Sequence, residues 1–90
     1  MNAARASMIR TVLEQALAPA SIDVTDDSAA HAGHAGAREG GHFSVVIVSE
    51  QFRGQSRLER HRQVYRALGD LRQQGIHALA IAARTPEETT

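Results

Sequence analysis

The feature that most constrains the fold is an eight-residue run at positions 42–49 (HFSVVIVS), which is nearly all apolar and rich in β-branched residues. Such side chains favour an extended backbone, so the run predicts a β-strand. After it, Ser56 and Glu59 form an S-x-x-E capping box that predicts the start of a helix. We expect this helix to end at Gly75 as its C′ residue, and the pattern also allows a break near Arg60. Its apolar residues are Leu58, Val64, Tyr65, Leu68 and Leu71.

Four further segments complete the predicted elements. Apolar residues at helical spacing over 3–18 predict an N-terminal helix, which Pro19 stops. The patterns at 22–25 and 77–83 predict two short strands. Residues 85–88 (TPEE) have the form of a helix start, with threonine as N-cap and proline at N1. Two helices on one face of a small, three-stranded mixed sheet would bury the apolar residues, so we expect an α+β domain.

The composition limits what such a domain can do. The chain has 90 residues, which fits one domain over 1–90 with a long loop at about 26–41 and a tail at about 85–90. It has no cysteine, which excludes a disulfide framework, a thiol nucleophile and a cluster held by its own thiolates. No catalytic motif is present, so we expect no enzyme. No apolar run approaches the ~20 residues of a membrane span and the N-terminus lacks a signal-peptide core, so we expect a cytoplasmic protein.

Five histidines carry most of the ligand chemistry. A neutral imidazole binds zinc, copper or iron, but a complete site usually needs about four ligands, which this chain could gather only from distant elements. The pattern therefore favours half of a metal site, completed by a partner. The alternatives are solvated loop histidines and a half-buried His77 that shares a strand face with Leu79 and Ile81. The histidines are His31 and His34 in the loop, His42 and His77 at strand starts, and His61 in the arginine-rich helix.

Four segments together resemble the BolA family. They are DDS followed by HAGHAG at 26–36, HFSVVIVS and F-x-G at 42–54, RHR-x-VY at 60–65, and GIHALAI closing with TPEE at 75–88. Each segment is short, but their order and spacing span nearly the whole chain. The resemblance implies an αββααβ fold similar to class II KH domains.

The resemblance also implies a partnership with a monothiol, CGFS-type glutaredoxin. In such complexes the glutaredoxin cysteine and glutathione each give a thiolate to a shared 2Fe–2S cluster, and the BolA-like protein supplies the remaining ligands. His77 matches the ligand at the start of the last strand. His31, with His34 as the alternative, matches the ligand in the loop. The implied role is non-enzymatic, in iron–sulfur cluster assembly, trafficking or iron regulation, and no cofactor is expected in the isolated chain.

The alternative function is a KH-like, nucleic-acid-binding transcriptional regulator. Six of the ten arginines lie within 53–72, which favours an anionic partner there, whether DNA, glutathione or an acidic protein surface. A formal net charge of zero weighs against DNA, because affinity for DNA comes largely from neutralising phosphates. An independent metalloenzyme is the third and least favoured hypothesis. The expected partner or nucleic-acid surface comprises Arg53, Arg57, Arg60, His61, Arg62 and Arg66.

Overall fold

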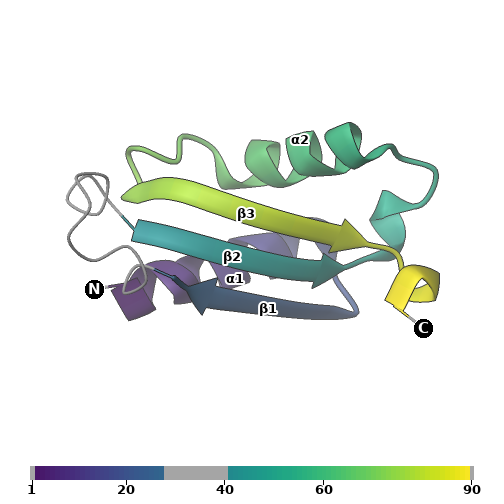
Figure 1. Ribbon diagram of the computed structural model, residues 1–90, viewed down its shortest axis with the longest axis horizontal. Helices are drawn as coiled ribbons and strands as arrows, with labels where there is room; N and C mark the ends of the chain where they lie inside the picture. Colours follow the sequence, from purple (N-terminus) through teal and green to yellow (C-terminus); the bar gives the residue numbers. More distant parts are fainter. Residues whose placement is uncertain (1, 28–40, 90) are drawn as a thin grey trace.

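The computed structural model describes residues 2–27 and 41–89 (Figure 1). The expected loop ligands His31 and His34 lie outside the described residues. In chain order the elements are α1 (Asn2–Leu17), β1 (Ser21–Asp26), β2 (Gly41–Val48), the 3-10 turn η3 (Glu50–Phe52), α2 (Arg57–Leu68), β3 (Ile76–Arg84) and the 3-10 turn η4 (Pro86–Thr89).

The apolar run at 42–49 forms the central strand of the sheet. β2 lies between β1 and β3, antiparallel to the first and parallel to the second. Its side chains alternate between the two faces of the sheet, so Phe43, Val45 and Ile47 are buried on one face. Because β2 and β3 are parallel, α2 provides the crossover between them.

Both helices pack on this buried face of the sheet. α1 buries Ile9, Leu13 and Leu17, which are spaced by four residues and therefore lie on one side of the helix. α2 adds Val64 and Leu68 to the same apolar cluster. The predicted α+β fold, with two helices and a three-stranded mixed sheet, is therefore confirmed. The opposite face of the sheet carries no helix among the described residues (Figure 1).

The boundaries of α2 differ from the prediction at one end only. The capping serine is confirmed, since the Ser56 hydroxyl accepts a hydrogen bond from the Glu59 backbone N–H at 3.1 Å. The helix is continuous through Arg60, without the break that the pattern allows there, and it stops at Leu68 rather than near Gly75. Gly69 adopts a φ of 79° and ψ of −146°, a region that side chains strongly disfavour, and this conformation ends the helix.

Two residues expected on the apolar face of α2 instead face solvent. Leu58 is 58% exposed and Tyr65 is 41% exposed, whereas Val64 beside it is fully buried. The helix therefore contacts the sheet through a narrower stripe than the sequence indicates.

The C-terminal segment forms a single 3-10 turn at the position where a helix start is predicted. Thr85 is buried, and its backbone N–H donates to the Glu88 carboxylate at 2.8 Å. This is the contact that a capping box makes, so the predicted helix start at Thr85 is confirmed. The helical segment that follows is a single 3-10 turn.

Candidate functional site

The candidate site lies where β2 and β3 begin. Parallel strands start at the same end of a sheet, and the antiparallel β1 finishes there. This end therefore brings together Asp27, His42 and His77. The chain leaves the described sheet after Asp27 and returns at Gly41, so the stretch with the two loop histidines attaches here.

A register irregularity sets the position of His77. Gly41 pairs with Ile76, but His42 pairs with Ala78, so one extra residue of β3 lies between the two pairs. Such a bulge interrupts the alternation of side chains along a strand. The expectation that His77 shares a face with Leu79 is wrong for this reason. His77 is exposed and its ring lies against that of His42, with ring centroids 5.1 Å apart and planes tilted by 46°.

The backbone around the two histidines is held by hydrogen bonds that lie outside the regular ladder. The Gly41 N–H donates to the Gly75 carbonyl at 2.8 Å, and the Asp27 N–H donates to the His42 carbonyl at 2.7 Å. A Cβ atom on Gly41 would collide with the Phe43 ring, so glycine allows that ring to fold back over the strand start. The backbone at both histidines is thus fixed, with His77 exposed and His42 half-buried.

A hollow of about 270 Å³ lies beside His42, and His77 is not among the residues that line it. The Ser44 hydroxyl donates to the Asp27 carboxylate within it. Small side chains on β3 leave the hollow open. Its lining is Asp27, His42, Phe43, Ser44, Ala78, Leu79 and Ala80.

The metal-binding side chains at this end of the sheet are too few for a complete metal site. Among residues 2–27 and 41–89, no three side chains of histidine, aspartate or glutamate converge as a metal-binding group. Two imidazoles supply at most half of a four-ligand shell. The structure is therefore compatible with a site that a partner, or the loop at 28–40, completes.

The arginines expected on a partner surface fall into two groups. Arg53 contacts Glu50 and Glu87, Arg62 contacts Glu59, and Arg60 contacts Glu88, so these charges are compensated within the chain. Hydrogen bonds to Glu87 and then Glu50 raise the pKa of Arg53. Arg57 and Arg66 form no ion pair within the described part of the chain and are exposed. His61 is half-buried on α2.

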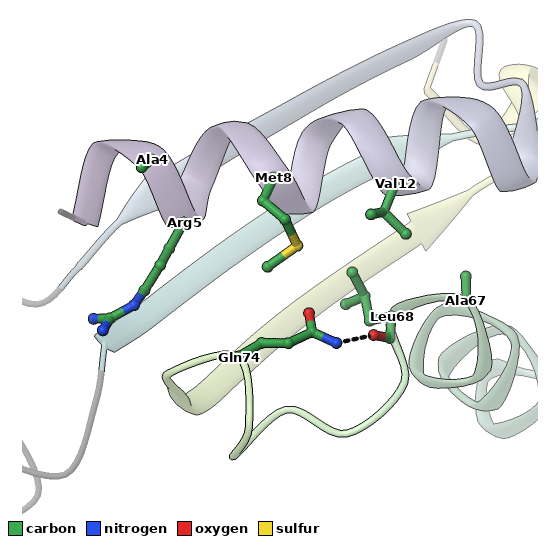
Figure 2. Close-up of a pocket in the computed structure, with 7 residues that line it drawn as sticks. All are labelled: Ala4, Arg5, Met8, Val12, Ala67, Leu68 and Gln74. Atoms are coloured by element: carbon green, nitrogen blue, oxygen red, sulfur yellow. Dashed lines mark hydrogen bonds between the residues drawn. The ribbon is translucent and has the colours of Figure 1, made fainter.

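A second, larger hollow separates the two helices (Figure 2). It measures about 480 Å³ and lies between α1 and the end of α2. Met8 and Val12 face Leu68 across it, and the Gln74 side chain donates to the Leu68 carbonyl. Nothing in the sequence pattern indicates this groove, because the residues on its two sides are far apart in the chain. The remaining lining residues are Ala4, Arg5 and Ala67.

The contact between the His42 and His77 rings is the feature of the site that the sequence does not predict. His42 carries no distinctive motif, and its neighbour is set by strand order and by the irregular register. The alternation of apolar and polar residues along a strand does not reveal whether the strand contains a bulge.

The fold and site define a small α+β protein with a histidine pair at one end of a three-stranded mixed sheet. A family model described as BolA-like protein matches residues 13–88. The chain belongs to the BolA-like family.

Curated relatives and a solved structure agree with this assignment. The chain is 45% identical over 80 residues to BolA-like protein 1 of Mus musculus, covering 89% of this chain and 57% of the mouse protein. It is 38% identical over 85 residues to the DNA-binding transcriptional regulator BolA of Escherichia coli, covering 90% and 79%. The solved BolA domain of SufE1 from Arabidopsis thaliana superposes with a TM-score of 0.81 at 46% identity, covering 93% and 94%.

This chain corresponds to part of several longer relatives. It spans 24% of the length of Arabidopsis SufE-like protein 1 and 57% of the mouse protein. Across residues 2–27 and 41–89, no helix is both long and apolar enough to cross a membrane.

Proposed function

We propose that this protein is a non-enzymatic partner of a monothiol glutaredoxin and that it co-ligates a 2Fe–2S cluster through His77 and a loop histidine. The observation that carries the proposal is the exposed imidazole of His77 at the end of the sheet where the loop attaches. Membership of the BolA-like family supports it. We place the role in cluster assembly, trafficking or iron regulation, in the cytoplasm.

The residues at this end of the sheet fit half of a cluster site. A 2Fe–2S cluster needs four donor atoms besides its own sulfides, and iron accepts imidazole in place of thiolate. The chain has no cysteine, so histidine is the donor type it offers. His77 would hold one position, and His31, with His34 as the alternative, would hold a second. The glutaredoxin cysteine and glutathione would supply the two thiolates.

Imidazole ligation has a defined chemical consequence. A cluster with histidine ligands has a higher reduction potential than one held by thiolates alone, as in Rieske centres. The contribution of this chain is to hold His77 at a rigid strand start, where the backbone bond from Gly41 to Gly75 fixes the adjacent turn.

The test is anaerobic cluster reconstitution with a monothiol glutaredoxin and glutathione, followed by visible absorption and circular dichroism. We expect wild-type protein to give a spectrum distinct from that of the glutaredoxin alone, and His77→Ala to abolish the difference. Gln73→Ala, which changes an exposed side chain outside both the strand starts and the expected partner surface, is the control and should behave as wild type. Comparing His31→Ala with His34→Ala assigns the loop ligand. A wild-type spectrum in His77→Ala would contradict the proposal.

The second candidate function is DNA binding, which the name of the E. coli relative favours. The exposed Arg57 and Arg66 offer local positive charge, but three neighbouring arginines are compensated by glutamates. Fluorescence anisotropy with duplex DNA between 50 and 200 mM salt tests this function. Sequence-dependent binding that persists at 200 mM salt would support it, whereas weak binding that salt abolishes would exclude it.

A further inference from the structure

The ring contact between His42 and His77 joins two imidazoles from neighbouring strands. The two residues are not sequence neighbours, and the irregular register places His77 beside His42 instead of on the buried face. Hydrogen bonds at Gly41 and Asp27 hold the backbone on either side. The pair is therefore a fixed juxtaposition of two nitrogen donors.

The spacing of the rings matches that of two imidazoles on one metal ion. An ion ~2.0–2.1 Å from each coordinating nitrogen lies roughly 3.2 Å from each ring centre, and a tetrahedral angle then separates the ring centres by about 5 Å. The observed centroid distance is 5.1 Å, and the planes are tilted by 46° rather than stacked in parallel.

The surroundings suit a small hydrated cation. The hollow that His42 lines also contains the Asp27 carboxylate, which adds negative charge near this ring. Imidazole prefers borderline divalent ions such as Zn²⁺, Ni²⁺ and Cu²⁺. Since no third ligand converges among the described residues, water would fill the other coordination positions.

We propose that His42 and His77 together bind one borderline divalent cation in the protein without its partner. This goes beyond the proposed function, because the ion needs neither the glutaredoxin nor the loop histidines. It also makes the cation and the shared cluster compete for His77, because an ion on His77 occupies the nitrogen that the cluster would use. Free divalent metal would then oppose cluster formation at this end of the sheet.

The experiment is a titration of the full chain with Zn²⁺ alone, followed by calorimetry and by NMR of the histidine ring nitrogens. We expect saturation at one ion per chain, with shifts of the His42 and His77 ring signals. His42→Phe keeps a ring against His77 but removes the donor nitrogen, so it tests ligation separately from packing. His42→Phe and His77→Ala should each weaken binding by at least about tenfold.

Two control variants locate the site. The double variant with His31→Ala and His34→Ala, and the single variant His61→Ala, should both bind Zn²⁺ as wild type does. Wild-type affinity in His42→Phe, or loss of binding in the loop double variant, would overturn the inference. The cluster spectrum of His42→Phe with glutaredoxin and glutathione is measured in a separate experiment. Loss of Zn²⁺ binding with a normal cluster spectrum, and loss of the cluster spectrum itself, are therefore distinguishable.

Discussion

Arg60 is held by several acceptors at once, although its sequence position suggests a surface role. Its guanidinium donates to the carbonyls of Gln55 and Ala83 and to both carboxylate oxygens of Glu88, and its side chain is only 13% exposed. This residue joins α2 to the end of β3 and to η4. Helical periodicity predicts where Arg60 lies on α2, but it gives no information about contacts with a segment 28 residues away.

The Arg60–Glu88 contact predicts a pH dependence of stability. The hydrogen bond from Arg60, and then the one from the Thr85 N–H, lower the pKa of Glu88 from 4.5 to about 2. A carboxylate with a depressed pKa in the folded state stabilises the fold above its unfolded pKa and loses that effect as pH falls through the folded value. The stabilisation from Glu88 should therefore be complete above about pH 4.5–5 and disappear towards pH 2.

Urea unfolding of wild type and Glu88→Gln at several pH values measures this effect. We expect Glu88→Gln to be less stable at pH 7 and equal to wild type near pH 2, because protonation makes the two side chains similar in charge. Glu14→Gln alters an exposed ion pair with Arg10 and serves as the control for losing a carboxylate. A constant difference between wild type and Glu88→Gln from pH 7 to pH 2 would contradict the assignment.

At the scale of elements, local signals placed every helix and strand that the structure describes. The strand at 42–49, the serine cap of α2 and the start at Thr85 depend on neighbouring residues, so the sequence predicts them well. The end of α2 is not predictable in this way, because Gly69 and Gly75 can both end a helix and the sequence does not show that Gly69 adopts the terminating conformation. The bulge beside His77 is also beyond sequence periodicity, because the register of β3 depends on its partner strand β2.

The N-terminal cap of α2 is an element-scale feature with a measurable contribution. Ser56→Ala removes the side-chain acceptor for the Glu59 N–H, so we expect a loss of about 0.5–2 kcal/mol in the free energy of unfolding. Ser56→Asp keeps an acceptor at the same position and should restore most of that loss. Chemical denaturation of both variants measures this change, and the slope of the unfolding free energy against denaturant concentration should stay the same as in wild type. Equal stability of the alanine and aspartate variants would show that the cap contributes nothing.

At the scale of the whole molecule, the two faces of the sheet differ. One face is covered by α1 and α2, and the other carries no described helix and is lined by small side chains beside the histidine pair. The site therefore lies next to an open surface while the core is built on the opposite side. This separation lets the strand starts present His42 and His77 without disturbing the packing of Phe43 and Val45.

The groove between the helices shows that the covered face is not fully filled, and it predicts a stabilising substitution. Ala67 lines the groove opposite Met8 and Val12, so Ala67→Leu would place added apolar atoms against apolar neighbours without entering the buried core. We expect a gain of about 0.5–2 kcal/mol in the free energy of unfolding, the usual range for filling a surface hollow. Ala16→Leu makes the same change at an exposed helical position of α1 and should alter stability by no more than about 0.5 kcal/mol. Thermal and urea unfolding of both variants measures the difference, and a destabilised Ala67→Leu would mean that the helices already pack too closely for a larger side chain.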